Sequence, residues 1–174
     1  MSNYKTKLAG IKAFAFDVDG VFTDGTVICT ENGDLLRSHN AKDGYALRKA
    51  ILNGFPVAII TGGASDSIIY RFEPLGVKDI YLKSSYKIPD FMDFCSKYDL
   101  SPNEVLFMGD DIPDIEIMKI CGLPCSPSDA VNEVKDISEY ISLYAGGHGC
   151  VRDIIEQTLK IQNKWYNTEN GVSG

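Results

Sequence analysis

Acidic, hydroxyl and amino side chains follow the short apolar segments of this sequence, at the points where those segments end. The residues are Asp17, Asp19, Thr61, Lys87, Asp110, Asp111 and Asp114. Carboxylates gathered in one crevice repel one another, and a hard divalent cation relieves that repulsion. Oxygen ligands without a nearby His or Cys favour Mg²⁺ over zinc. If the fold brings these segments together, the residue types predict a magnesium site.

Such a cluster is suited to the chemistry of phosphate esters. An aspartate beside a magnesium ion can attack phosphorus and form an aspartyl phosphate. A second carboxyl group two residues further on can protonate the leaving alkoxide and later take a proton from water. A lysine and a threonine can bind the oxygens of the transferred group. The pattern therefore predicts a phosphomonoesterase.

Each motif is weak alone. An Asp-x-Asp pair is usually a solvated turn, Gly-Asp-Asp often begins a helix, and a lone lysine is usually exposed to solvent. Their order, and their shared position at the ends of predicted strands, favours a common site.

The elements that position these residues alternate between strands and helices. Short apolar runs at Ala13–Phe16, Pro56–Ile60, Ile80–Leu82 and Val105–Met108 are typical of buried parallel strands. Apolar stripes with helical spacing lie between and after them. We therefore predict an α/β fold, a Rossmann-like doubly wound parallel sheet with helices on both faces. In such sheets ligands bind at the carboxyl ends of the strands.

Two segments depart from this alternation. Asn32-Gly33 lies between two extended runs, and the segment at about 26–38 is predicted to form a projecting β-hairpin. The polar C-terminal tail, at about 165–174, is predicted to lie outside the core. Residues 1–174 are expected to form a single phosphatase domain.

Composition narrows the functional classes. The 174 residues are 44% hydrophobic and 24% charged, with a formal net charge of −7. An acidic chain of this kind is a poor candidate for binding nucleic acid or anionic membranes. The sequence has no apolar run of membrane-spanning length, and its five cysteines have no disulfide or zinc spacing. We expect a cytoplasmic protein that acts on a small molecule.

The set of motifs resembles the four motifs of haloacid dehalogenase-superfamily phosphatases. The matching segments are Phe16-Asp17-Val18-Asp19-Gly20-Val21 with Thr23-Asp24-Gly25, then Thr61-Gly62, Lys87, and Gly109-Asp110-Asp111 with Asp114. The resemblance implies that Asp17 is the nucleophile and Asp19 the general acid and base. It places Mg²⁺ on Asp17, the backbone carbonyl of Asp19, and Asp110, with Asp111 and Asp114 supporting the site. It assigns Thr61 and Lys87 to the phosphoryl group.

Two further segments, 40–45 and 146–152, resemble the small capless branch that contains the phosphatases of 3-deoxy-D-manno-octulosonate 8-phosphate (KDO 8-phosphate), and related sugar-acid phosphatases share these segments. The resemblance implies KDO 8-phosphate as the first choice of substrate, and so a step in lipopolysaccharide sugar synthesis. The intervals between the motifs are filled by single helices and strands, which leaves no room for a lid domain. The branch implies a homotetramer in which neighbouring subunits complete each active site. We expect the hairpins to assemble the tetramer and the tail to close an adjacent pocket.

The branch also suggests which residues bind the substrate. They are Asp19, Asn40, Ala41, Lys42, Asp43, Gly44, Arg48, Gly62, Arg71 and Lys87. This chain departs from the branch at two positions, because Gly63 and His148 stand where arginine or lysine is common. The loss of a planar cation removes a possible carboxylate contact, which bears on the identity of the sugar.

Other functions are compatible with parts of the pattern. The nearest alternative substrate is a nine-carbon sugar-acid 9-phosphate. A phosphoacceptor signalling module also has clustered aspartates, a threonine and a lysine, but Asp19 supplies the acid and base that turnover needs. A catalytically silent regulator is disfavoured by the intact motifs. His39 and Arg37 are expected in non-catalytic roles, with Arg37 solvated or at an interface.

Overall fold

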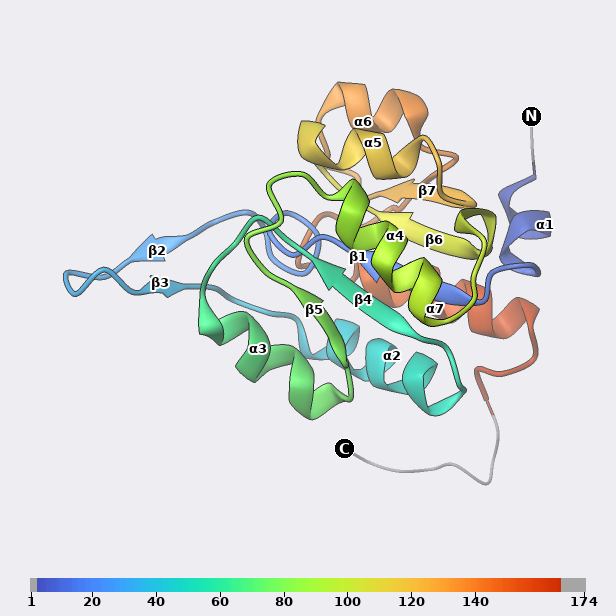
Figure 1. The fold of residues 1–174 in the computed structure, drawn as a ribbon, viewed down its shortest axis with the longest axis horizontal. Helices are drawn as coiled ribbons and strands as arrows, with labels where there is room; N and C mark the ends of the chain where they lie inside the picture. The colour runs from blue at the N-terminus through green and yellow to red at the C-terminus, as the bar shows by residue number, and fades with distance from the viewer. Residues whose placement is uncertain (1–2, 167–174) are drawn as a thin grey trace.

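The computed structural model describes residues 3–166. Six parallel strands form one sheet in the order β5-β4-β1-β6-β7-β8, with helices on both faces (Figure 1). The strands are β1 (Ala13–Phe16), β4 (Val57–Ile60), β5 (Asp79–Tyr81), β6 (Val105–Met108), β7 (Leu123–Ser126) and β8 (Tyr140–Ile141). The chain winds outward from β1 in both directions, so β1 and β6 flank the switch point where such sheets bind ligands. The predicted doubly wound α/β fold is confirmed.

The helices divide into two layers, one on each side of the sheet. One layer holds α1 (Tyr4–Leu8), α2 (Ala41–Leu52), α3 (Asp66–Phe72) and α7 (Cys150–Ile161). The opposite layer holds α4 (Ile88–Lys97), α5 (Ile115–Met118) and α6 (Asn132–Ile137). Three short 3₁₀ helices complete the described chain: η1 (Glu73–Leu75), η2 (Pro102–Glu104) and η3 (Ile112–Asp114).

Side chains of β1 alternate between the two layers, as a strand buried on both faces requires. Phe14 and Phe16 enter the core beneath α2, α3 and α7, whereas Ala13 and Ala15 enter the core beneath α4 and α5. The α3 helix begins where Ser65 accepts a hydrogen bond from the backbone N–H of Ser67. These buried elements fix the end of β1, and so fix where the first acidic motif begins.

A small antiparallel hairpin projects from the side of the sheet where the carboxyl ends of the strands lie (Figure 1). Its strands are β2 (Ile28–Cys29) and β3 (Leu35–Leu36), and the turn between them contains Gly33 at a φ of 85°. Glycine favours this left-handed conformation because it has no Cβ. The hairpin therefore forms where the Asn-Gly pair predicts it, although its ladder is shorter than the extended runs.

The structure contains elements that the apolar pattern did not predict. These are β7, β8, α1 and α6. Pro124 interrupts the β-forming pattern of β7, and β8 is a strand of only two residues at the edge of the sheet. Neither segment therefore shows a clear hydrophobic pattern typical of a strand. Within residues 3–166, no helix is both long and apolar enough to cross a lipid bilayer.

Candidate active site

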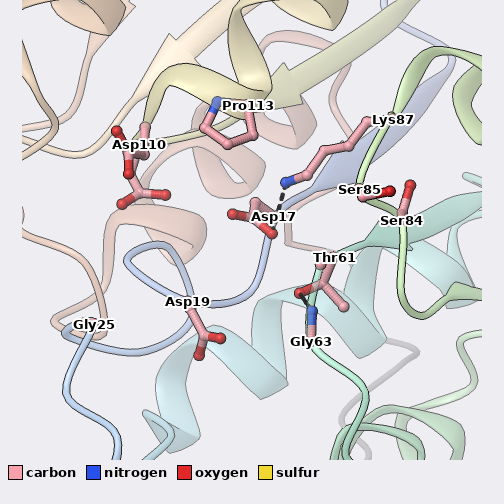
Figure 2. Close-up of a pocket in the computed structure, with 12 residues that line it drawn as sticks. Asp17, Asp19, Gly25, Thr61, Gly63, Ser84, Ser85, Lys87, Asp110 and Pro113 are labelled. Atoms are coloured by element: carbon pink, nitrogen blue, oxygen red, sulfur yellow. Dashed lines mark hydrogen bonds and ion pairs between the residues drawn. The ribbon is translucent and has the colours of Figure 1, made fainter.

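The carboxyl ends of β1, β4 and β6 converge on one pocket. Its volume is about 560 Å³, and its lining includes Asp17, Asp19, Gly25, Thr61, Gly62, Gly63, Ser84, Ser85, Lys87, Asp110, Asp111 and Pro113 (Figure 2). Parallel strands bring residues far apart in sequence to the same edge, which explains the convergence. The structure thus brings together the acidic, threonine and lysine motifs.

Lys87 lies at the start of α4 and joins two of the aspartates. Its Nζ donates to Asp114 Oδ1 at 2.7 Å and lies 3.0 Å from Asp17 Oδ1. All three residues are buried. The pKa of Asp17 is raised to about 7, first by burial and then by the charge of Asp114, although Lys87 acts to lower it. The ammonium therefore offsets part of the negative charge around the nucleophile candidate.

Asp110 lies near Asp17 and Asp114 but, unlike them, forms no ion pair with Lys87. Among residues 3–166 its Oδ1 is buried without a hydrogen-bond partner, and carboxylate oxygens of Asp17, Asp110 and Asp114 lie within 4.8 Å of one another. Burial, followed by the charges of Asp17 and Asp114, raises the pKa of Asp110 to about 8. A buried acceptor without a donor, beside two further carboxylates, fits a hard cation such as Mg²⁺.

Gly20 allows Asp110 to lie close to the first acidic loop. A Cβ at position 20 would lie 2.0 Å from Asp110 Oδ2, and Gly20 has a φ of 86°. A larger residue would therefore displace the carboxylate as well as strain the backbone. This close approach places the loop after β1 against the loop after β6.

Asp114 and Asp111 shape the loop that carries Asp110. The Oδ2 of Asp114 accepts from the backbone N–H of Asp110 at 3.0 Å, while its Oδ1 accepts from Lys87. The Asp111 side chain accepts from the backbone N–H of Ile112 at the start of η3. Both arrangements suit the supporting role that the family resemblance implies, although the metal contacts themselves stay predictions.

Asp19 lines the pocket but forms an ion pair with Arg37. Arg37 Nε donates to Asp19 Oδ1 at 2.7 Å and Nη2 donates to Asp19 Oδ2 at 3.0 Å. The Arg37 side chain is only 5% exposed. The expectation that Arg37 is solvated is therefore wrong for this chain, whereas its place at an interface stays a prediction. The error arose because the fold returns the end of the hairpin to the first acidic loop, which local sequence does not reveal.

Thr61 and Gly62 lie at the pocket as predicted, and two serines join them. Thr61 is buried after β4, and its Oγ1 accepts from the backbone N–H of Gly63 at 3.1 Å. Ser84 and Ser85 line the same pocket, three and two residues before Lys87. The sequence analysis missed these serines, although their place just after a predicted strand is the signal that identified the other residues.

The branch-specific residues at the start of α2 lie outside this pocket lining. Asn40 begins the helix, accepting from the backbone N–H of Lys42 at 2.8 Å and donating to the Gly147 carbonyl at 3.2 Å. Asp43 is buried, and its Oδ1 accepts from the backbone N–H of Arg152. These contacts give both residues a packing role, and their contact with substrate stays a prediction.

The same holds for the remaining predicted substrate contacts. Arg48 is exposed on α2, and Arg71 donates to the Asn40 carbonyl at 3.4 Å. Ala41, Lys42 and Gly44 also do not line the pocket around Asp17. His39 packs edge-on against Phe72, and burial with nearby arginines lowers its pKa to about 4, which fits a neutral, non-catalytic residue.

Comparison with known proteins places this geometry in a family. Residues 75–154 match the model of the haloacid dehalogenase-like hydrolases. The chain is 35% identical to the 3-deoxy-D-manno-octulosonate 8-phosphate phosphatase KdsC of Salmonella typhi over 91% of this chain and 85% of the relative. It is 34% identical to the Escherichia coli K12 enzyme of the same name, over 91% and 84% of the two chains.

Solved structures agree with this assignment. The Yersinia pestis 3-deoxy-D-manno-octulosonate 8-phosphate phosphatase matches with a TM-score of 0.92 and 30% identity, over 94% of this chain and 89% of that chain. The Moraxella catarrhalis enzyme, solved with a magnesium ion, a phosphate ion and KDO, matches with a TM-score of 0.91 and 30% identity, over 95% of each chain. A signalling module is not favoured by these matches. The chain belongs to the haloacid dehalogenase-like hydrolases, in the branch of the KDO 8-phosphate phosphatases, and is a phosphoric monoester hydrolase.

Proposed function

We propose that the chain hydrolyses KDO 8-phosphate to KDO and inorganic phosphate in lipopolysaccharide sugar synthesis. The observation that carries the reaction class is the convergence of Asp17, Asp110 and Lys87 on one pocket, with Asp19 two residues after Asp17. Similarity to phosphatases of KDO 8-phosphate, over nine-tenths of the chain, carries the choice of substrate.

Asp17 acts as the nucleophile. One of its carboxylate oxygens attacks phosphorus, the bond from phosphorus to the sugar oxygen breaks, and Asp19 gives a proton to that oxygen. Asp19 then takes a proton from water, and the resulting hydroxide attacks the phosphorus of the aspartyl phosphate. This step releases inorganic phosphate and regenerates the Asp17 carboxylate. Lys87 and Thr61 bind the phosphoryl oxygens, and Lys87 also orients Asp17 through their ion pair.

Asp17, the backbone carbonyl of Asp19, and Asp110 would hold the magnesium ion, while Asp111 and Asp114 support the loop. The unpartnered Asp110 Oδ1 is the feature of this chain that best fits a bound cation. A magnesium ion supplies positive charge that draws the phosphate to Asp17 and stabilises charge as it develops. The relative from Haemophilus influenzae, 28% identical, has also been solved with cobalt, and assays with each divalent ion test which metal supports turnover best.

The substrate is tested by comparing three phosphate esters with and without Mg²⁺. We expect the highest kcat/KM for KDO 8-phosphate, a lower value for a nine-carbon sugar-acid 9-phosphate, and the lowest for glucose 6-phosphate. A preference for the nine-carbon ester would select the alternative substrate. Gly63 and His148, the two positions where this chain departs from the branch, would then be the first residues to examine for that specificity. A preference for glucose 6-phosphate would reject the sugar-acid assignment but keep the reaction class.

The active unit in this proposal is a homotetramer of single-domain subunits. Support comes from the hairpin, where Ile28 is 61% exposed and Leu36 is 52% exposed. Such apolar side chains on a projecting hairpin suit contact with another copy of the chain. In the tetramer a neighbouring subunit would cover the open pocket and bring the residues around Asn40–Gly44, Arg48 and Arg71 into reach of a substrate.

The proposed compartment is the cytoplasm. All five cysteines are unpaired, and Cys95, Cys121, Cys125 and Cys150 are buried. Burial raises the pKa of Cys95 to about 11 and that of Cys121 to about 12, which keeps both thiols protonated and unreactive. Unpaired thiols suit a reducing compartment. Fractionation of cells that produce the protein tests this placement.

A further inference from the structure

Arg37 is a buried cation next to the active-site pocket, and the mechanism above gives it no role. Both oxygens of Asp19 accept hydrogen bonds from its guanidinium, at 2.7 Å and 3.0 Å. The third nitrogen, Nη1, is buried and has no partner among the described residues. The hydrogen bonds that Arg37 donates to Asp19 raise the pKa of Arg37, so the guanidinium stays charged. A buried fork of this kind is suited to binding carboxylates.

The ion pair conflicts with the catalytic role of Asp19. A general acid must carry its proton on an oxygen that faces the leaving group, but both Asp19 oxygens face the guanidinium. Figure 2 shows the Asp19 carboxylate pointing away from Asp17. Asp19 must therefore leave Arg37 before it can protonate a leaving alkoxide. Turnover then depends on what replaces Asp19 at Arg37.

The guanidinium lies next to two residues of the pocket lining. A Cβ at Gly63 would lie 3.6 Å from Arg37 Nη2, and both Gly63 and Asp19 line the pocket. Arg37 therefore lies behind Asp19 and beside the small residue at position 63, close to where a ligand in the pocket would bind. His39 is neutral because its pKa is lowered to about 4, and Arg71 is a cation, so neither offers Arg37 a second anionic partner.

We propose that Arg37 exchanges the Asp19 carboxylate for the carboxylate of the substrate, and that this exchange releases Asp19 for catalysis. The inference rests on the proposed function, because it requires a substrate that is a sugar acid. Replacing one carboxylate by another keeps the buried guanidinium paired, so the exchange avoids leaving an uncompensated charge. A neutral sugar phosphate has no group that can take the place of Asp19. Arg37 is thus a positioning residue that makes turnover specific for acids.

The test compares two substrates in the wild type and in the variants Arg37→Gln and Arg37→Lys. Wild-type protein is first assayed with KDO 8-phosphate and glucose 6-phosphate, and a lack of preference there would reject the proposed function rather than this inference. Given that preference, Arg37→Gln should lower kcat/KM for KDO 8-phosphate by about ten- to a hundredfold. Its activity on glucose 6-phosphate should stay the same or rise, because Asp19 is no longer held.

The conservative variant and a matched control complete the comparison. Arg37→Lys keeps the charge without the fork, so its loss on KDO 8-phosphate should be smaller than that of Arg37→Gln. Lys12→Gln makes the same change of charge at the amino end of β1, away from the pocket at its carboxyl end. Lys12 pairs there with Glu104, and the variant should match the wild type. Equal fractional losses on both substrates in Arg37→Gln would show a merely structural role and overturn the inference.

A binding measurement gives a readout that does not depend on turnover. Calorimetric titration with free KDO should show affinity about tenfold weaker in Arg37→Gln than in the wild type, since a charge-assisted pair is lost. Thermal unfolding confirms that the variant is folded during this titration. Unchanged affinity for KDO in a folded variant would overturn the exchange, whatever the kinetics show.

Discussion

The Nζ of Lys87 lies 2.7 Å from Asp114 and 3.0 Å from Asp17, so one buried ammonium serves two carboxylates from different elements. Asp17 follows β1, Asp114 ends η3, and Lys87 precedes α4. The contact therefore ties three parts of the chain together at the centre of the pocket. No cation of residues 3–166 forms an ion pair with Asp110, which is the electrostatic reason why the site suits a metal ion.

Replacement of Lys87 should destabilise the metal-free protein. Lys87→Met leaves two buried carboxylates without their partner, and breaking a buried pair in this way costs about 3–5 kcal/mol. Urea unfolding in the presence of a chelator measures the free energy of unfolding. The double variant Lys87→Met, Asp114→Asn should recover part of the loss, because one of the two stranded charges is removed. If the two substitutions destabilise additively, Lys87 and Asp114 are not coupled as described.

Stability of the metal-free protein should fall as pH rises from about 6.5 to about 8.5. The folded-state pKa values of Asp17 and Asp110 are raised to about 7 and about 8. The folded state therefore holds protons that the unfolded state has released, and stability is lost as pH rises through these values. Below pH 6.5 the lowered pKa of His39 acts in the opposite direction, because the unfolded state then binds the proton.

Saturating Mg²⁺ should reduce that loss, because the cation replaces the protons on the carboxylates. Thermal unfolding between pH 6.5 and 8.5 measures how the unfolding temperature depends on pH, once with a chelator and once with Mg²⁺. In the matched variant Asp110→Asn, the unfolding temperature of the metal-free protein should depend less on pH and should rise less on addition of Mg²⁺. Identical pH profiles with and without the metal would contradict the assigned ligand set.

Asp17→Asn should abolish the covalent step. The amide is nearly the same size but is a poor nucleophile, so kcat should fall by about a thousandfold or more. Rapid quenching with labelled substrate should trap phosphoenzyme in the wild type and none in the variant. Asp136→Asn, at an exposed position on α6, is the matched control and should keep full activity. Wild-type turnover by Asp17→Asn would disprove the aspartyl-phosphate mechanism.

The sequence was sufficient to predict that these polar side chains converge, because the carboxyl ends of parallel strands meet on the same side of the sheet. Asp17, Thr61, Lys87 and Asp110 could be placed together from that rule alone. Arg37 could not, since its partner depends on the path by which the hairpin returns to the sheet. Nor could β8, whose two residues are held in the sheet by pairing with β7 rather than by any pattern of their own.

The C-terminal residues 167–174 lie outside the described residues, and their predicted role in covering a neighbouring pocket needs a separate test. Trp165 packs beneath Arg152, with the guanidinium carbon 4.5 Å from the ring centre. Deletion of 167–174 keeps this contact, whereas deletion of 165–174 removes it. We expect the shorter deletion to change kcat or KM for KDO 8-phosphate without lowering the unfolding temperature. Unchanged kinetics would assign the tail no part in catalysis.

The exposed hairpin leads to a prediction about assembly. Ile28 and Leu36 are paired across β2 and β3, and both are exposed. Ile28→Lys with Leu36→Lys would place charges where the proposed tetramer buries apolar surface, so the tetramer should dissociate into smaller species. Sedimentation velocity measures the change, and circular dichroism checks that the fold is kept.

Activity of the dissociated form then separates assembly from chemistry. Turnover of p-nitrophenyl phosphate, a small ester, should fall less than turnover of KDO 8-phosphate, because only the larger substrate needs a neighbouring subunit to complete its site. Leu143→Lys, at another exposed apolar position, changes charge in the same way outside the hairpin and is the control. A hairpin variant that remains tetrameric would show that the subunits meet through another surface.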